Sequence, residues 1–229
     1  LVPVHFYMPS GLGLNNYYLT FPSLSLSAIK DNYFDKTVIQ VAKIIDTLKN
    51  RISGAEAGGK LIVLHGPPGT GKTYMIRSIL SELKKTWSNC ICSPPLHFLK
   101  NLPDLLTATS EHKNNIIIFE DVGELFAKDA RINFLDQFSN LNNLCDGFLS
   151  LLKNNIYIFT FNTSIENIDE AVIRRGRCID VIKFDYLGYD QACKISDQEL
   201  DPKQQYTLAD VYNIGFQSKL LTHKTNVGF

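Results

Sequence analysis

The sequence has no excess of charge of either sign, since 23 lysines and arginines balance 23 aspartates and glutamates over 229 residues. A net charge of zero excludes a bulk attraction to nucleic acid or to anionic lipid, although it permits a local basic patch. No apolar run reaches the roughly 18 residues that a membrane-spanning helix needs, so we predict no membrane segment in this chain. The chain begins with leucine and has no basic leader, which indicates a piece of a longer protein.

Cysteine is scarce, with five residues in the whole chain: Cys90, Cys92, Cys145, Cys178 and Cys193. An odd number in a chain of this size favours free thiols over a disulfide framework. No second cluster of cysteine and histidine accompanies the Cys-x-Cys pair, so we do not expect a zinc site. Free thiols persist in a reducing compartment, and we therefore predict a cytoplasmic protein.

Five short apolar runs alternate with stretches of helical or mixed pattern, and each run is typical of a buried strand. The runs occupy residues 61–64, 89–92, 116–119, 156–161 and 179–184. Between Asp35 and Leu48 the apolar residues recur at helical spacing, which predicts a helix before the first run. The alternation predicts an α/β fold in which a five-stranded parallel sheet is sandwiched between helices.

The composition divides the chain into three regions. Residues 1–28 are rich in Pro, Ser, Gly, Leu and Tyr without a clear period, and we interpret them as an extended lead-in or the remnant of an N-terminal region. Residues 29–185 form the predicted α/β core. Residues 186–229 are expected to form a small C-terminal helical lid and tail, with short helices at 189–195 and 207–214, and are too few to fold alone.

The segment GPPGTGKT follows the first apolar run and matches the phosphate-loop pattern G-x-x-x-x-G-K-[ST]. Its glycines let the backbone curl so that main-chain N–H groups point at a polyphosphate, and the next helix adds its positive N-terminal end. Lys72 supplies a charge to the β- and γ-phosphates, and Thr73 offers a hydroxyl to Mg²⁺. Tyr74 either stacks on the base or packs in the core. The predicted nucleotide-binding residues are Gly66, Pro67, Pro68, Gly69, Thr70, Gly71, Lys72, Thr73 and Tyr74.

Two acids, Glu120 and Asp121, follow the apolar run at 116–119. The carboxyl end of a parallel strand near the phosphate loop is where a Mg²⁺ ligand and a water-activating carboxylate are needed. The spacing from the loop leaves room for one intervening strand and helix. We therefore predict that this pair belongs to the nucleotide site.

The run at 156–161 ends at Asn162, whose amide can orient an attacking water beside the γ-phosphate. Arg174, Arg175 and Arg177 follow within a few residues. They form either a solvated basic turn or an arginine finger, which stabilises charge on the transferring phosphoryl group. Because they lie far from the strand ends near the nucleotide, a finger here would serve the site of a neighbouring subunit.

Together, GPPGTGKT, IIIFED and TFNTSIENIDEAVIRRGRC resemble the core of an AAA-family ATPase, which has a P-loop NTPase fold, over about residues 30–195. Within that class the chain is similar to two branches: bacterial and phage-type AAA proteins, and the mitochondrial AAA protein that assembles respiratory complex III. The resemblance implies ATP and Mg²⁺ as ligands and a homo-oligomeric ring, usually a hexamer. It also implies ATP hydrolysis that remodels a macromolecular partner, here an unknown protein.

The resemblance also implies a role for each motif residue. Thr73 and Glu120 would serve Mg²⁺, and Asp121 would be the general base. Asn162 matches the family's sensor asparagine, while Asp146 and Gly147 match the Asp-Gly that usually precedes that region. The arginines that reach across a subunit interface in the family match Arg174 and Arg177.

The sequence departs from the family pattern in three places. Glu120 and Asp121 invert the usual Asp-Glu order, so the shorter Asp121 must reach a water one methylene further away. Arg175 replaces the usual proline or aromatic residue between the finger arginines, which leaves open which of the three is the finger. The segment SPPLHFLKN lacks the aromatic-apolar-Gly motif of a pore loop, and its Phe98 and Leu99 either pack in the core or grip a substrate.

Two alternative functions remain open. The inverted acid pair also fits a nucleotide-gated binding module that binds ATP but scarcely hydrolyses it. The second alternative is a nucleic-acid-associated loader or helicase-like ATPase, which the zero net charge does not support. Lys84, Lys85 and Trp87 form a small basic-aromatic cluster that can touch nucleic acid, although a helix C-terminus also explains the two lysines.

Overall fold

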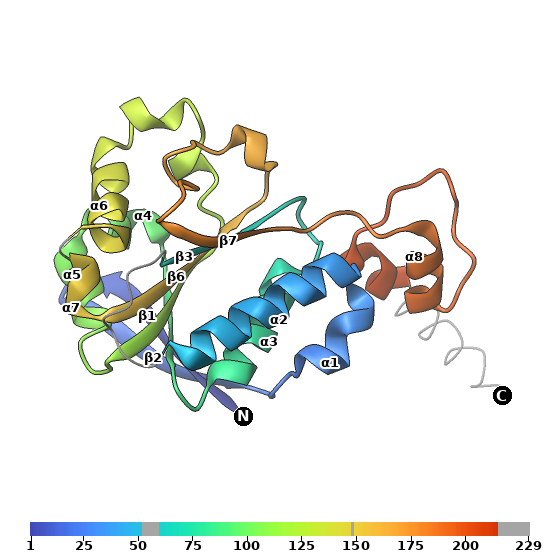
Figure 1. Cartoon of the computed structure of the whole chain (residues 1–229), viewed down its shortest axis with the longest axis horizontal. Helices are drawn as coiled ribbons and strands as arrows, with labels where there is room; N and C mark the ends of the chain where they lie inside the picture. Colours follow the sequence, from blue (N-terminus) through green and yellow to red (C-terminus); the bar gives the residue numbers. More distant parts are fainter. Residues whose placement is uncertain (52–59, 148, 215–229) are drawn as a thin grey trace.

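The computed structural model describes residues 1–51, 60–147 and 149–214, and a seven-stranded sheet runs through its centre (Figure 1). The strands lie in the order β2-β1-β4-β5-β6-β3-β7. Every neighbouring pair is parallel except β1 with β2. The strands are β1 (Val2–Ser10), β2 (Gly13–Phe21), β3 (Leu61–His65), β4 (Ser88–Cys92), β5 (Asn114–Phe119), β6 (Asn154–Phe161) and β7 (Cys178–Lys183).

All five predicted strands are present as β3 to β7, which confirms the parallel α/β sheet of a P-loop fold. The predicted number of five is wrong, because residues assigned to an extended lead-in form two further strands. β1 and β2 make an antiparallel hairpin over their full length, from the pair Val2–Phe21 to the pair Ser10–Gly13. β1 also joins β4 in parallel. The hairpin therefore widens the sheet, and β2 is one of its edges.

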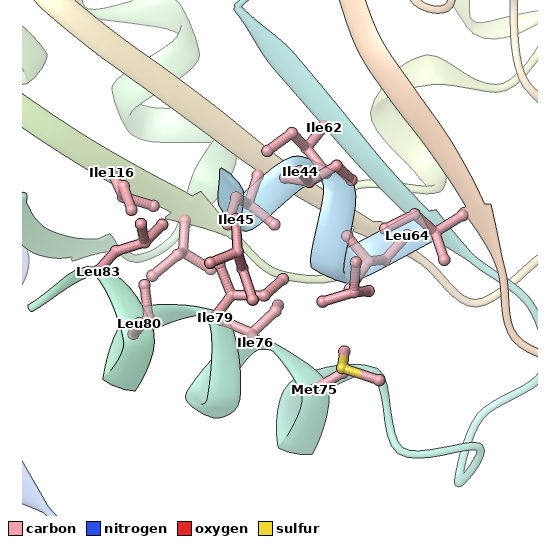
Figure 2. Close-up of a cluster of buried hydrophobic side chains, with 14 of the residues drawn as sticks. Ile44, Ile45, Ile62, Leu64, Met75, Ile76, Ile79, Leu80, Leu83 and Ile116 are labelled. Atoms are coloured by element: carbon pink, nitrogen blue, oxygen red, sulfur yellow. The ribbon is translucent and has the colours of Figure 1, made fainter. Parts of the chain in front are cut away.

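One face of the sheet is covered by helices α1, α2 and α3 (Figure 1). The buried residues of α2 recur at helical spacing, as the sequence predicts, so that one apolar stripe faces the sheet. The helices are α1 (Leu26–Ile29), η1 (Lys30–Asn32), α2 (Asp35–Asn50) and α3 (Lys72–Leu83). Figure 2 shows the resulting cluster between α2, α3, β3 and β5: Ile44, Ile45, Ile62, Leu64, Met75, Ile76, Ile79, Leu80, Leu83 and Ile116.

The opposite face is covered by α4, α5 and α6, with the short α7 beside α6 (Figure 1). Alternate residues of each central strand point to the two faces, so each strand contributes to both apolar clusters. The result is a three-layer core with an apolar cluster on each face of the sheet. The elements on this side are α4 (Pro95–Lys100), α5 (Leu102–Ala108), η2 (Glu124–Phe126), η3 (Ala130–Ile132), α6 (Leu135–Cys145), α7 (Leu149–Leu152) and η4 (Ile165–Asn167).

A small helical region follows β7 and lies beyond the N-terminal end of α2, near α1 (Figure 1). It contains α8 (Tyr189–Ser196) and a second helical stretch at residues 208–214, which confirms both helices expected there. Ala192, Leu200, Tyr206 and Val211 form its own apolar cluster. Residues 215–229, which the sequence analysis assigned to the same region, lie outside the described residues.

Candidate nucleotide-binding site

The glycine-rich loop runs from the end of β3 to the start of α3, as the sequence predicts. Gly66 and Gly71 have φ values of +138° and +89°, which L side chains rarely adopt. A Cβ atom on Gly71 would lie 2.8 Å from both the hydroxyl of Tyr33 and a methyl of Leu208. The loop therefore needs glycine for its backbone conformation and for the close approach of neighbouring side chains.

The ε-amino group of Lys72 lies inside the loop that it closes. Its Nζ donates hydrogen bonds to the carbonyl oxygens of Gly66 and Pro67, both at 2.8 Å. Burial lowers the pKa of Lys72 to about 8, while the negative charge of Asp121 opposes this shift. A phosphate in the loop would favour the charged form of the amine. A phosphate that binds in the loop would therefore stabilise the protonated amine of Lys72.

Thr73 and Glu120 meet at the carboxyl edge of the sheet, where Thr73 Oγ1 donates a hydrogen bond to Glu120 Oε1 at 2.6 Å. Thr73 is the second residue of α3, and Glu120 follows the last residue of β5. Secondary structure therefore fixes both positions. A hydroxyl and a carboxylate are oxygen ligands of the kind that Mg²⁺ takes, so this pair fits the metal that the loop implies.

Asp121 adopts a backbone conformation that is uncommon for a residue other than glycine, with φ of 55°. Two hydrogen bonds to β6 hold this turn: Asp121 N–H donates to Thr160 Oγ1 at 2.8 Å, and Val122 N–H donates to Thr160 O at 3.0 Å. The negative charge of the Asp121 carboxylate raises the pKa of Lys72 and so opposes the effect of burial. Thr160 is 39 residues away from Asp121 in the chain, and no local sequence pattern predicts their contact.

A cavity of about 580 Å³ opens beside the loop. Several residues predicted to bind nucleotide line it, together with the predicted sensor Asn162: Pro68, Gly69, Gly71, Lys72, Thr73 and Tyr74. Gly66, Pro67 and Thr70 shape the loop without lining the cavity, and Thr70 Oγ1 donates to Pro67 O at 2.8 Å. The structure thus brings the loop and the end of β6 to one cavity, which lies within the usual range for a small-molecule site.

Four further residues line this cavity, and the sequence analysis did not include them: Arg77, Leu208, Ala209 and Tyr212. The last three belong to the C-terminal helical region. Ala209 N–H donates to Gly69 O at 2.9 Å, and the hydroxyl of Tyr33 donates to Gly71 O at the same distance. The region after β7 therefore contacts the phosphate loop directly and forms one wall of the site.

The three arginines have different surroundings. Arg174 and Arg175 are exposed. Arg177 is only 4% exposed, and its Nε and Nη2 donate to Asp146 Oδ2 at 3.0 and 2.7 Å. Its Nη1 donates to the carbonyl oxygen of Ala171. Since Arg177 is occupied within its own chain, its geometry argues against a role in a neighbouring site, whereas Arg174 is free to extend from the surface.

Phe98 and Leu99 are fully buried and belong to the apolar cluster under α4, α5 and α6. The interpretation that they grip a substrate is therefore wrong, and the packing alternative is correct. Among the described residues of α4, no aromatic side chain is exposed. This segment thus contributes to the core of the domain.

All five cysteines are free, as expected, and burial raises the pKa of Cys90, Cys145 and Cys178 to about 12. These thiols stay protonated near neutral pH and are poor nucleophiles. Among residues 1–51, 60–147 and 149–214, no group of three or more His, Cys, Asp or Glu side chains is arranged to hold a metal ion. In the same residues, no helix has the length and apolar character to cross a membrane.

Comparison with known proteins identifies the family. The model of the "ATPase family associated with various cellular activities (AAA)" matches residues 62–186, which is more than half of the chain. The matched segment contains the phosphate loop, both acids, Asn162 and the three arginines. This chain belongs to the AAA family of ATPases, which confirms the resemblance noted from its motifs.

Three curated relatives illustrate the similarity. The chain is 32% identical over 160 residues to the AAA-ATPase At5g40000 of Arabidopsis thaliana. It is 26% identical over 153 residues to the ATP-dependent zinc metalloprotease FtsH of Mycoplasma genitalium, and 28% identical over 153 residues to the vacuolar protein sorting-associated protein 4 of Dictyostelium discoideum. These matches cover 61%, 60% and 60% of this chain but only 33%, 21% and 34% of the relatives.

Proposed function

We propose that this chain is the core of a Mg²⁺-dependent, homo-oligomeric ATPase, most simply a hexamer, that uses ATP hydrolysis to remodel a protein partner. The observation that carries the proposal is the contact of 2.6 Å between Thr73 Oγ1 and Glu120 Oε1 beside a loop closed by Lys72. Membership of the AAA family supports ATP-driven remodelling in general. The five free cysteines support a reducing compartment such as the cytoplasm.

Each residue of the carboxyl edge has a task in this proposal. The main-chain N–H groups of the loop and Lys72 would hold the phosphates, while Thr73 and Glu120 would hold Mg²⁺. Mg²⁺, when bound, neutralises charge on the β- and γ-phosphates. The carboxylate of Asp121 accepts a proton from the attacking water, and the amide of Asn162 orients that water.

The turn at Asp121 offers an explanation for the inverted acid pair. Its left-handed backbone conformation changes the direction in which the side chain leaves the main chain. Thr160 stabilises that conformation through the hydrogen bond to Asp121 N–H. We propose that this turn compensates for the methylene that aspartate lacks relative to glutamate, so that the shorter side chain still serves as the base.

We further propose that Arg174 acts in the site of the neighbouring subunit, where it stabilises charge on the transferring phosphoryl group. Its exposure supports this role. Arg177 would then be a positioning residue, since its ion pair with Asp146 holds the segment that carries Arg174.

Complementation between two inactive variants tests both the chemistry and the shared site. Lys72→Ala removes the phosphate contact within one subunit, and Arg174→Ala removes the group supplied to a neighbour. We expect each variant alone to release little phosphate from MgATP, and a mixture of the two to recover part of the parent's turnover. Arg175→Ala, which removes an exposed arginine next to Arg174, should keep the parent's turnover and serves as the matched control.

Two results would oppose the proposal. If the mixture stays as inactive as its components while both variants still assemble with the parent, Arg174 does not act across an interface. If the parent binds ATP but releases no phosphate at any protein concentration, the nucleotide-gated module is the better account of this fold.

A further inference from the structure

A second cavity, of about 420 Å³, lies at the edge of the sheet opposite the phosphate loop. It is built around the first residues of β4 and β5 and the start of β1, whereas the nucleotide site lies at the other ends of the strands. The residues after α3 and the side chain of Tyr18 from β2 complete its walls. Four segments that are distant in sequence thus meet there.

The lining of this cavity is basic, although the chain as a whole is neutral. Lys84, Lys85 and Lys113 line it together with His5, and its lining contains no aspartate or glutamate. Among the described residues, no carboxylate forms an ion pair with any of these three lysines. Lys84 Nζ instead lies 3.2 Å from Ser23 Oγ. Within the part of the chain that the structure describes, the cavity therefore concentrates positive charge with no carboxylate in its lining.

Aromatic rings line the same cavity as these lysines. Tyr18 is 65% exposed, and its ring contacts the imidazole of His5 edge-on, with centroids 5.6 Å apart. His5 also approaches the imidazole of His112, with centroids 5.8 Å apart. An exposed tyrosine next to lysines offers a flat surface for a planar group beside a place for an anion.

Asn89 joins the start of β1 to the first residues of β4 in the wall of the cavity. Asn89 is 2% exposed, and its Nδ2 donates to the carbonyl oxygen of Pro3 at 3.1 Å. Its Oδ1 accepts no hydrogen bond from the part of the chain that the structure describes. Less than 1 Å² of this oxygen is exposed, so it lies behind the surface of the cavity, and Asn89 contributes to the wall through its hydrogen bond to Pro3.

We propose that this cavity binds single-stranded nucleic acid, with one nucleotide in the cavity and the flanking phosphates on Lys84, Lys85 and Lys113. The base stacks on Tyr18, and the uncompensated lysines hold the backbone. The ligand class follows from this combination, because an acidic peptide would use the lysines but would gain little from an exposed ring. The proposal is independent of ATP hydrolysis at the phosphate loop.

The charge component is tested by the anisotropy of a labelled 12-nucleotide single strand in 50 and 200 mM salt. Neutralising three phosphates gives a slope of about −2 in log K against log salt, so affinity should fall roughly twentyfold over this range. Lys85→Ala with Lys113→Ala should weaken binding and reduce the slope by about 1.4. The control is Lys36→Ala with Lys43→Ala, which removes the same amount of charge from two exposed lysines of α2. It should leave the affinity and the salt slope unchanged.

The stacking component is tested with two tyrosines that are adjacent on β2 and point to opposite faces of the sheet. Tyr18→Ala should weaken binding about fivefold or more, and Tyr18→Phe should restore it because the ring is kept. Tyr17→Ala, at a position with 49% exposure, is the matched control and should bind as the parent does. All measurements are repeated in the Lys72→Ala background, which excludes binding of the strand at the phosphate loop.

The proposal fails if Lys85→Ala with Lys113→Ala weakens binding no more than the α2 control does, or if Tyr18→Ala and Tyr17→Ala behave alike. It also fails if a poly-glutamate peptide of the same length competes as well as the oligonucleotide, since the site would then recognise charge alone. Thermal unfolding of Tyr18→Ala alongside the parent separates a lost ligand contact from a damaged hairpin.

Discussion

The two edges of the sheet present anion-binding groups in opposite ways. At the carboxyl edge, one continuous loop would offer main-chain N–H groups to the phosphates that we propose it binds, and its glycines permit the positive φ values of the loop. At the amino edge, Lys84, Lys85 and Lys113 surround a cavity with long side chains. Helix α3 connects the two, since it begins at Lys72 and ends at Leu83.

The difference between the edges has a physical consequence. A site made of main chain depends on backbone geometry, so a single added methyl group can destroy it. A site made of lysine side chains depends on charge, so it tolerates changes in shape and weakens with salt. The carboxyl edge should therefore respond most strongly to substitutions that move or remove single atoms.

The largest effect is expected at the carboxylate that we assign as the general base. Asp121→Asn keeps the size of the side chain but cannot accept the proton, so the turnover number should fall by about 10²–10⁴-fold with little change in ATP affinity. Phosphate release and equilibrium ATP binding measure the two quantities. Asp129→Asn, at an exposed position nearby, should behave as the parent does.

Glu120→Gln distinguishes the roles of the two acids. If Glu120 holds Mg²⁺, this variant should need a higher Mg²⁺ concentration for half-maximal turnover. A loss of turnover in Glu120→Gln at an unchanged Mg²⁺ requirement would instead make Glu120 the base and would contradict the assignment of Asp121.

The second effect concerns the backbone at the start of the loop. A Cβ atom on Gly66 would lie 1.9 Å from the carbonyl oxygen of Phe184, which is main chain and cannot move aside. Gly66→Ala should therefore destabilise the domain by about 3 kcal/mol or more in denaturant unfolding. Gly123→Ala, where a Cβ atom meets nothing within 4 Å, should change stability by well under 1 kcal/mol. Equal stabilities of the two variants would refute the geometry of the loop.

The third effect is a pH dependence of nucleotide affinity. The pKa of Lys72 is lowered to about 8 without ligand, and a bound phosphate raises it, so binding takes up a proton once the pH exceeds that value. ATP affinity should be flat from pH 7 to about 8 and then fall by up to tenfold per pH unit. Isothermal titration in two buffers of different ionisation enthalpy measures the uptake. Lys72→Arg, which stays charged, should show no such fall.

The same shift affects the stability of the protein without nucleotide. Lys72 titrates at about 8 in the folded chain and at 10.5 in the unfolded chain, so the unfolded state binds more protons between these values. The contribution of this group to the free energy of unfolding therefore increases as the pH rises from about 8 towards 10.5. Lys72→Met should remove that increase.

The smallest effect is expected at Thr160, which holds the turn without touching the ligand. Thr160→Val keeps the shape but leaves Asp121 N–H without its acceptor, which should raise the barrier to hydrolysis by about 1–2 kcal/mol. The loss should appear in kcat and not in KM, because phosphate binding is unaffected. Thr160→Ser should restore most of the rate. An equal rate in both variants would remove Thr160 from the mechanism.

Sequence reasoning succeeded where a feature is continuous along the chain. The phosphate loop, the acids after β5 and Asn162 after β6 each follow an apolar run directly, so a local pattern predicted their position. The helical spacing within α2 and the short helix α8 were predicted in the same way. These elements establish the central strands and the carboxyl edge of the sheet.

Sequence reasoning failed where the two partners of a contact are distant in sequence. Pro3 and Pro9 lie near the ends of β1 and interrupt the pattern expected of a strand, so its pairing with β2 and β4 was not visible. The ion pair of Arg177 with Asp146 joins residues 31 apart, and no local pattern indicates it. The wall formed by Leu208, like the basic cavity at the amino edge, exists only after the chain has folded.

The most direct test of the central claim is the rate of phosphate release by the unmodified chain at saturating ATP, with and without Mg²⁺. We predict release that requires Mg²⁺, that rises per subunit with protein concentration, and that Lys72→Ala abolishes. Tight ATP binding without release at any concentration of protein or Mg²⁺ would contradict the claim that this edge of the sheet hydrolyses ATP.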